Sequence, residues 1–422
     1  MRILVLGSGA REHAIITALL REEPRHHVVA APGNAGIAAD VPVVALDATD
    51  PSMVTNYAIE NNIELVVIGP EAPLVAGVAD ALRTRGIPVF GPGKAAAALE
   101  GSKTFAKRVM EQAGVPTGRA VRAGTLAEAK AALDEFGAPY VIKADGLAAG
   151  KGVLVTSERP AAVAHATHWL QHGSVLIEEF LDGPEVSLFL LSDGHSVLPL
   201  SPAQDYKRLG DGDTGPNTGG MGAYSPLPWL DAEFGSEQAF VDEVIETVAL
   251  PTVRQLARDD TPFIGLLYCG LILTDAGIRV IEFNARFGDP ETQVVLPRLV
   301  TPLSGLLLAA STGALGGLAR PEFSEEACVT VVLASENYPD APVTGRVVSG
   351  LDEASAVPGV TIAHAATAAR GASLVATGGR VLSVVAVGGD FAAARARAYE
   401  ALGRITLAGS QFRTDIAARV AG

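Results

Sequence analysis

The sequence predicts a multidomain α/β protein that begins with a parallel sheet, and three observations lead to this prediction. The chain has 422 residues, of which 48% are hydrophobic and 19% charged, as in ordinary globular proteins of two to four domains. Within residues 1–100, short and almost entirely apolar runs alternate with helical stretches. Most of these runs end in glycine or proline turns, which is typical of parallel strands covered on both faces by helices.

The N-terminal strands are expected at the apolar runs of this region. They are predicted at Ile3–Leu6, Val28–Ala31, Val41–Leu46, Leu65–Ile68 and Pro88–Phe90. Ligands of parallel sheets bind beyond the carboxyl ends of the strands. The turns that follow the strands are therefore candidate substrate loops.

The remaining elements form a middle region and a tail. A helix is predicted from Ser102, its N-cap, to Ala113, before Gly114. Residues 117–190 indicate strand, helix, strand, glycine-rich turn, strand, helix and strand, and residues 195–300 are mixed with a long loop from Asp205 to Pro226. An αβ tail follows, with strands such as Val329–Ala334 and Val381–Val387. We place domain boundaries at 1–101, 102–322 and 323–422, with a smaller unit at about 120–190.

Charge and composition exclude several classes of function. The formal net charge is 32 − 47 = −15, which argues against broad binding to nucleic acid or to anionic membranes. Two cysteines provide neither a disulfide framework nor a cysteine-rich metal site. A strand pattern begins at Arg2, leaving no room for a signal peptide, and prolines interrupt the apolar stretch at 294–310. We therefore expect a cytoplasmic enzyme or binding protein.

The first loop, Gly7–His13, follows a strand and opens a helix, where backbone N–H groups favour an anion. The dinucleotide fingerprint requires a small residue where this sequence has Glu12, and the second strand lacks a terminal acid. Together with two further loops at the same sheet edge, this favours a small phosphorylated substrate, although a tight turn without a ligand is the alternative. The candidate substrate-binding residues of these loops are Gly9, Arg11, Glu12, Asn34, Gly36, Pro70 and Glu71.

The middle region has features of a nucleotide site. A strand delivers Lys143, and the loop from Asp145 to Gly152 offers backbone amides and Lys151 to phosphate oxygens. Lys103 lies in the first turn of a helix, where a cation opposes the helix dipole, and this favours a role in anion binding. The glycine-rich loop lacks the Walker pattern, so a flexible hairpin is the alternative.

A predicted strand at Val175–Leu181 runs into a turn followed by Glu185. Backbone groups in such a hinge can bind adenine, and a carboxylate can bind ribose hydroxyls. A surface acidic turn is the alternative.

The segment 280–286 is the most informative one. Period-two alternation places Ile281, Phe283 and Ala285 on one strand face. Glu282, Asn284 and Arg286 then share the other face, where oxygen ligands suit Mg²⁺ and a guanidinium suits phosphate. A half-exposed strand with a cross-strand ion pair is the alternative.

Taken together, these motifs resemble the ATP-grasp carboxylate–amine ligases. Within that superfamily, several segments are similar to the phosphoribosylamine–glycine ligase (glycinamide ribonucleotide synthetase) family, namely 7–13, 31–36, 69–74, 213–224 and 287–293. The resemblance covers residues 1 to about 310 and, more loosely, the tail, which contains Gly378–Leu382. It implies a Rossmann-like N-terminal domain, an ATP-grasp clamp of two subdomains with a lid at about 120–190, and a small C-terminal αβ domain.

The resemblance also implies roles for individual residues. ATP is expected to contact Lys103, Lys143, Gly150 and Lys151 through its phosphates, and Glu178, Glu179, Leu181 and Glu185 through its adenosine. Glu282 and Asn284 would bind Mg²⁺ or Mn²⁺, and Arg286 would steady the transferred phosphoryl group. The long loop is hypothesised to hold glycine and the sugar phosphate through Asp205, Lys207, Arg208, Asp213, Thr214, Asn217, Gly220 and Met221, with Lys207 and Asp213 counted as catalytic.

The implied reaction is the ATP-dependent joining of glycine to 5-phosphoribosylamine through a glycyl phosphate, a step of de novo purine biosynthesis. Another ATP-grasp ligase or carboxylase is the alternative, and it should lack the 213–224 segment. A nucleotide-binding module without activity and a hydride-transfer enzyme are weaker readings. The partners would be small molecules only, and the chain would be a monomer or weak homodimer.

Overall fold

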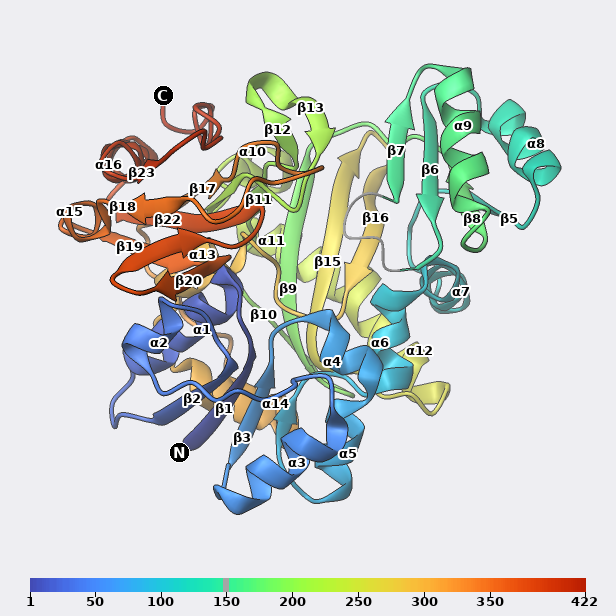
Figure 1. Ribbon diagram of the computed structural model, residues 1–422. Coiled ribbons are helices and arrows are strands. Elements are labelled where there is room, and N and C mark those ends of the chain that lie inside the picture. Colours follow the sequence, from blue (N-terminus) through green and yellow to red (C-terminus); the bar gives the residue numbers. More distant parts are fainter. Residues whose placement is uncertain (147–151) are drawn as a thin grey trace.

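The computed structural model describes residues 1–146 and 152–422 (Figure 1). Its N-terminal part is a parallel sheet in the order β2-β1-β3-β4. The strands are β1 (Arg2–Gly7), β2 (His27–Pro32), β3 (Leu65–Ile68) and β4 (Val89–Phe90). The helices are α1 (Ala10–Leu20), α2 (Ile37–Asp40), α3 (Pro51–Glu60), α4 (Glu71–Ala76), α5 (Val78–Thr84) and α6 (Lys94–Gly101).

The predicted strand at Val41–Leu46 is wrong. This segment makes only an isolated bridge between Val43 and Ala30 beside β2. Pro42 has no N–H group to donate, and the Val43 side chain is 40% exposed, so the segment can neither extend the ladder nor bury a face.

The unit predicted at about 120–190 is an antiparallel sheet in the order β5-β8-β6-β7, covered by two helices. Its elements are β5 (Ala120–Ala123), α8 (Leu126–Phe136), β6 (Tyr140–Ala144), β7 (Val153–Thr156), α9 (Arg159–Trp169) and β8 (Val175–Glu178). Before it, α7 (Lys103–Ala113) begins where Ser102 Oγ accepts the N–H of Phe105 at 3.1 Å, and it ends at left-handed Gly114. The predicted order of elements is confirmed, and so are the two ends of α7.

The central sheet has the antiparallel order β10-β9-β15-β16. Its strands are β9 (Glu185–Asp193), β10 (Val197–Pro199), β15 (Ile264–Thr274) and β16 (Gly277–Asn284). The accompanying helices are α10 (Leu230–Phe234), α11 (Glu237–Val244), η2 (Ile245–Ala249), α12 (Leu250–Arg258), α13 (Thr292–Val295), η3 (Leu296–Arg298), α14 (Leu303–Thr312) and η4 (Leu315–Gly317).

A β-bulge interrupts β16. Gly270 pairs with Glu282 whereas Leu271 pairs with Val280, so Ile281 is the extra residue. The expectation that Ile281 shares the buried face of Phe283 is therefore wrong, while the exposed fractions of Phe283 (3%) and Ala285 (1%) confirm that these two point inward.

The C-terminal sheet contains strands from two distant parts of the chain. Its order is β11-β14-β17-β22-β19, formed by β11 (Gln204–Asp205), β14 (Gly222–Ser225), β17 (Ala327–Ala334), β19 (Val360–His364) and β22 (Arg380–Gly388). A smaller sheet and two helices accompany it, namely β18 (Val347–Ser349), β20 (Thr367–Arg370), β21 (Ser373–Ala376), β23 (Thr406–Leu407), α15 (Leu351–Ser355) and α16 (Phe391–Leu402).

The stretch predicted as a long loop is thus largely ordered into strands. Between β11 and β14 it forms a hairpin of β12 (Arg208–Gly210) and β13 (Thr214–Asn217), joined by η1 (Asp211–Asp213). The hairpin projects beside the C-terminal end of the chain in Figure 1. We refer to residues 208–217 as the hairpin below.

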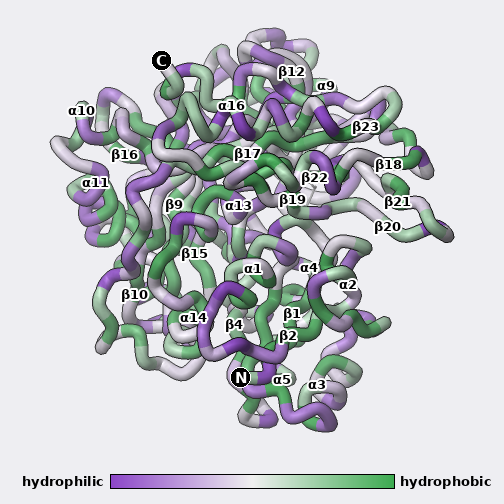
Figure 2. The backbone as a smooth tube through the Cα atoms, turned by 90° about the vertical axis from the view of Figure 1, so that its left-hand side faces the viewer, coloured by the Kyte–Doolittle hydropathy of each residue, from purple (hydrophilic) through white to green (hydrophobic). Residues whose placement is uncertain are grey.

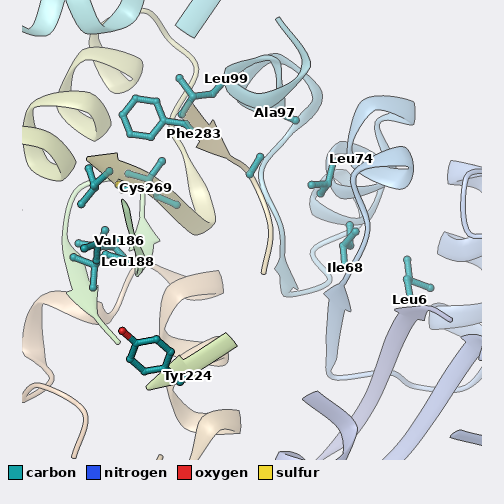
Figure 3. Close-up of a cluster of buried hydrophobic side chains, with 14 of the residues drawn as sticks. Leu6, Ile68, Leu74, Ala97, Leu99, Val186, Leu188, Tyr224, Cys269 and Phe283 are labelled. Atoms are coloured by element: carbon teal, nitrogen blue, oxygen red, sulfur yellow. The ribbon is translucent and has the colours of Figure 1, made fainter. Parts of the chain in front are cut away.

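Two large hydrophobic clusters each join the N-terminal, central and C-terminal parts. Figure 3 shows Leu6 and Ile68 in the same cluster as Leu188, Phe283 and Tyr224. The unit at 120–190 has a separate small cluster around Leu133 and Ile177. Apolar segments concentrate in the sheet strands in Figure 2, and within residues 1–146 and 152–422 no helix is long and apolar enough to cross a membrane.

Candidate active site

The site begins where the 120–190 unit meets β16. Strand β6 carries Lys143, whose Nζ lies 2.9 Å from Glu178 Oε2 on the neighbouring strand β8. The same Nζ donates to the carbonyl of Ile281 at 3.2 Å. Lys143 is only 5% exposed, so this lysine fixes the 120–190 unit against the bulge of the central sheet.

A second lysine, which the sequence analysis missed, holds the same carboxylate. Lys107 Nζ lies 3.4 Å from Glu178 Oε2 and donates to the Gly118 carbonyl at 2.8 Å. Burial lowers the pKa of Lys107, and the Glu178 charge opposes that shift. Lys107 follows Lys103 by one helical turn on α7, and this i,i+4 spacing is the signal that could have revealed it.

Lys103 faces the start of the glycine-rich loop. Its Nζ donates to the carbonyl of Gly146 at 3.3 Å, and burial lowers its pKa while Glu282 raises it. Asp145 anchors the base of this loop by accepting from Thr104 Oγ1 at 2.6 Å. The predicted phosphate contacts Gly150 and Lys151 lie outside the described residues.

The hinge after β8 has defined contacts. Glu179 accepts the backbone N–H of Arg119 at 2.8 Å and its Nε at 3.0 Å, which fixes the carboxylate away from Glu178. Leu181 follows, and Glu185 at the start of β9 forms an ion pair with Lys207. Gly183 has a φ of +147°, and a Cβ there would lie 1.9 Å from the carbonyl oxygen of Leu273.

Glu282 and Asn284 are arranged as the sequence predicts. They lie two residues apart beyond the bulge of β16, and among the described residues neither side chain has a hydrogen-bond partner. Burial raises the pKa of Glu282, but Lys207, Lys143 and Lys103 lower it, and the net shift is downward. An ionised carboxylate and an amide oxygen that protein donors leave free fit a hard divalent cation.

Lys207 and Asp205 bring opposite charges to this place. Burial lowers the pKa of Lys207, but Asp205, Glu185 and Glu282 raise it well above its usual value. Burial raises the pKa of Asp205 to about 7, with Lys207 opposing and Glu291 and Glu185 reinforcing the shift. These residues of the predicted loop therefore lie within electrostatic reach of the Glu282 carboxylate.

Arg286 connects this region with the N-terminal part. Its Nη2 lies 3.0 Å from Glu100 Oε1, and its Nε lies 3.6 Å from Glu71 Oε2 at the start of α4. Glu100 also accepts the N–H of Ala285 at 2.8 Å. The structure thus brings together Arg286 and Glu71, which the sequence placed in different candidate sites.

The Glu12 side chain occupies the space beside the glycines of the first and third N-terminal loops. Its carboxylate accepts the N–H of Gly9 at 2.6 Å and lies 2.5 Å from Arg11 Nε. A Cβ on Gly69 would be 2.1 Å from Glu12 Oε1. Glu12 therefore fills the space between the first and third loops, and Pro70 follows as the N-cap of α4.

The second loop is tied to the C-terminal part. Asn34 Nδ2 donates to the carbonyls of Ser8 and His364, each at 2.8 Å, and its Oδ1 accepts the N–H of Gly36 at 2.9 Å. The His364 ring packs against Gly36, where a Cβ would come within 2.3 Å of it. Asn34 and Gly36 thus shape the loop as well as offering groups to a substrate.

The hairpin residues make their contacts with one another and with the segment around Arg413, not with Glu282 or the lysines near it. Arg208 binds the Gly215 carbonyl at 2.9 Å, Thr214 binds the Asp211 carbonyl at 2.9 Å, and Asp213 pairs with Arg413 at 2.7 Å. Asn217 pairs with Arg208 across the hairpin. Beyond Asn217 the chain returns to the C-terminal sheet, where Met221 is fully buried and Gly220 lies against Pro290. Of the predicted loop residues, only Asp205 and Lys207 are shown near Glu282.

Two further charged groups were not among the predicted site residues. Glu291, 3% exposed, accepts from Tyr268 and from Ser187 Oγ at 3.3 Å. Arg380 of β22 lies 3.1 Å from Asp289 Oδ2 and also donates to the Gly219 carbonyl. Both depend on contacts between distant segments that no local pattern reveals.

A small antiparallel unit facing a central antiparallel sheet, with lysines between them and a carboxylate and an amide side by side on β16, defines an ATP-grasp enzyme. Three family models match consecutive parts of the chain: phosphoribosylglycinamide synthetase N domain at 1–100, ATP-grasp (A) domain at 101–292 and C domain at 328–419. The chain belongs to the phosphoribosylglycinamide synthetase family, whose members are ATP-dependent ligases of purine biosynthesis.

Similar proteins agree with this assignment. The chain is 75% identical to the phosphoribosylamine–glycine ligase of Leifsonia xyli subsp. xyli, over 99% of this chain and 100% of that protein. A crystal structure of phosphoribosylamine–glycine ligase from Thermotoga maritima has a TM-score of 0.84 at 33% identity, covering 98% of this chain and 100% of that one. The biotin carboxylase domain of Hydrogenobacter thermophilus 2-oxoglutarate carboxylase, at 18% identity and a TM-score of 0.70 over 97% and 91%, shares the fold alone.

Proposed function

We propose that this ligase joins glycine to 5-phosphoribosylamine and forms glycinamide ribonucleotide, ADP and phosphate. Family membership supports the reaction, and the arrangement around Glu282 supports the chemistry. A glycine carboxylate is a poor electrophile, so phosphoryl transfer from ATP must first give a glycyl phosphate. The amine then attacks the acyl carbon, and phosphate leaves.

The single observation that carries the chemistry is the pair Glu282 and Asn284, whose side chains bond to no group within residues 1–146 and 152–422 and of which Glu282 lies near three lysine charges. These two residues would hold Mg²⁺ or Mn²⁺, which supplies charge neutralisation at the phosphates when bound. Lys103 and Lys143 would bind phosphate oxygens beside them. Positioning and electrostatic stabilisation of this kind account for most catalysis of phosphoryl transfer.

The nucleotide base is proposed to lie at the hinge. Glu178 is held by Lys107 and Lys143, so its orientation is fixed before a ligand arrives. Within the described residues, the backbone N–H of Leu181 makes no hydrogen bond to protein, which leaves it free for adenine. Glu185 would serve the ribose, near Lys207.

The two other substrates, glycine and the sugar phosphate, are proposed to approach from opposite sides of Glu282 and Asn284. Asp205 and Lys207 would bind glycine, because their charges lie within reach of Glu282. The loops that carry Gly9, Asn34 and Glu71 would bind the sugar phosphate at the carboxyl edge of the N-terminal sheet. Arg286 lies between these regions and would steady the transferred phosphoryl group. Because the relatives are ligases of purine biosynthesis, we propose a cytoplasmic location.

Substitution of Glu282 tests this assignment. Glu282→Gln keeps the shape of the side chain but removes a charged oxygen ligand, so kcat for ADP release should fall by about 100-fold or more. The assay uses glycine, freshly prepared phosphoribosylamine and Mg²⁺, and compares glycine with bicarbonate and with other amino acids. Glu246→Gln, at an exposed position on η2, is the matched control. Substantial activity of Glu282→Gln would remove Glu282 from the metal site, and ADP release with bicarbonate alone would indicate a carboxylase.

A further inference from the structure

Arg413, near the C-terminal end, is a charged side chain with an unusual degree of burial: the residue is 1% exposed. Its guanidinium binds Asp415 through two nitrogens, at 2.7 and 2.6 Å, and binds Asp213 Oδ1 at 2.7 Å. It also donates to the Arg208 carbonyl at 3.2 Å. Arg413 thus connects the C-terminal segment with the first strand of the hairpin and with the turn that follows it, some 200 residues earlier in the chain.

The same guanidinium supports the segment before the hairpin. It lies over the Tyr206 ring at 4.7 Å from the centroid, and the Tyr206 hydroxyl accepts the N–H of Ala417 at 2.9 Å. Neighbouring side chains of an extended segment point in opposite directions. With Tyr206 turned toward Arg413, Asp205 and Lys207 on either side of it turn toward Glu185 and Glu282, as their mutual pKa effects also indicate.

The hairpin needs such an anchor. Most of its residues are exposed, and an isolated two-stranded hairpin is at best marginally stable in water. Three further hydrogen bonds fasten its turn to the same C-terminal segment: Asp211 accepts the Thr414 N–H at 2.8 Å and the Thr414 hydroxyl, and Asp415 accepts the Gly212 N–H at 2.9 Å. At the other face, the Asp205 carboxylate lies near Lys207 and near the carboxylates of Glu291, Glu185 and Glu282.

We propose that Arg413 is a positioning residue, which holds Tyr206 and Asp213 so that Asp205 and Lys207 face the glycine site. The proposal rests on the proposed function and adds a role for the C-terminal segment. It also changes the role expected of Asp213, which acts through the hairpin and not on a substrate. The hydrogen bonds of Arg413 go to Asp415, Asp213 and the Arg208 carbonyl, and its role in the proposal is indirect.

Kinetics of variants at Arg413 test the proposal. Misplacing Asp205 and Lys207 by about 1 Å should lower kcat/KM for glycine by about 100-fold in Arg413→Ala. Arg413→Lys keeps the charge but loses the fork, and it should recover about tenfold of that loss. MgATP affinity, measured by calorimetry in the absence of glycine, should stay within about twofold because the ATP contacts are elsewhere. Arg419→Ala, at an exposed position of the same segment, is the matched control and should behave as the wild type.

The outcomes separate the proposal from the proposed function. Wild-type enzyme without glycine-dependent ADP release would overturn the proposed function, and the inference with it. An active wild type with unchanged glycine kinetics in folded Arg413→Ala would overturn the inference alone. If Arg413→Ala does not fold, the variants Tyr206→Leu and Asp213→Asn test the inference instead. A raised KM for glycine with normal ATP affinity would support the inference. An unchanged KM for glycine would overturn it.

Discussion

At the scale of single residues, Glu178, which we propose to bind adenosine, illustrates how neighbours fix the direction of a carboxylate. Its carboxylate is shared by Lys143 and Lys107, both more than three-quarters buried as side chains. Charges in such surroundings interact more strongly than in water. Removing one lysine leaves the other, so the carboxylate stays paired but loses one of the contacts that fix its direction.

Lys107→Ala should therefore weaken ATP binding without abolishing it. We expect a rise of about tenfold in KM for ATP, because one charge-assisted contact is lost, while KM for glycine stays unchanged. Steady-state kinetics with each substrate varied in turn measure both values. Lys130→Ala removes an exposed lysine from α8 and is the control. Equal changes in both KM values would indicate general damage to the fold.

Whether these residues could be predicted depends on whether their roles follow from a local pattern or from partners distant in the sequence. Lys143, Glu282 and Asn284 stand in local patterns, a strand end and a two-residue repeat, and such patterns are visible in the chain itself. Lys107, Arg380 and Arg413 acquire their roles through partners 70 to 200 residues away. Apart from the i,i+4 spacing of Lys107 from Lys103, nothing in their immediate sequence separates these residues from ordinary surface cations.

At the scale of elements, the N-terminal sheet and the order of elements in the 120–190 unit could be predicted because apolar runs and turns mark them. The elements that the sequence did not predict, namely two strands of the long loop and the bulge of β16, have physical causes. Strands β11 and β14 lack an apolar repeat of useful length and exist because β17 offers a partner, Gly222 facing Val331. The bulge at Ile281 likewise depends on the register of β15, which the sequence of β16 alone does not specify.

The hinge between β8 and β9 contains a position where only glycine fits. Gly183→Ala would place a Cβ 1.9 Å from the Leu273 carbonyl oxygen at a φ of +147°. We expect the free energy of unfolding to fall by about 3 kcal/mol, from backbone strain and forced displacement of β15. Gly137→Ala shares a positive φ of +73° without any atom within 4 Å, and it should cost only about 1 kcal/mol. Denaturant unfolding followed by tryptophan fluorescence compares the two, and equal losses would show that the clash relaxes.

At the scale of the whole molecule, His364 couples the C-terminal sheet to the N-terminal loops. Its backbone N–H donates to His13 Nδ1 at 2.9 Å, and its ring packs on Gly36. Burial and the neighbouring His13 together lower the pKa of His364 to about 4, with Asp40 opposing the shift. The neutral ring is therefore part of the contact between the two ends of the chain.

A depressed histidine pKa has a defined effect on stability. The unfolded side chain, with a pKa of about 6.5, binds a proton more readily than the folded one. The stability that His364 contributes should thus be complete above pH 6.5 and decline progressively between pH 6.5 and 4. Comparing the thermal midpoints of wild type and His364→Gln over this range measures it, since the variant lacks the titrating group. Parallel curves for the two proteins would contradict the assignment.

The mixed origin of the C-terminal sheet limits how this enzyme can be divided. Strand β14 belongs by sequence to the middle of the chain, yet one of its ladders is made with β17. Cutting the polypeptide near residue 322 would strip β14 of that neighbour and leave a row of unsatisfied amide and carbonyl groups. Open strand borders of this sort recruit other chains. The last hundred residues are thus needed to complete the sheet that contains β14. The middle region cannot finish folding until these residues have left the ribosome.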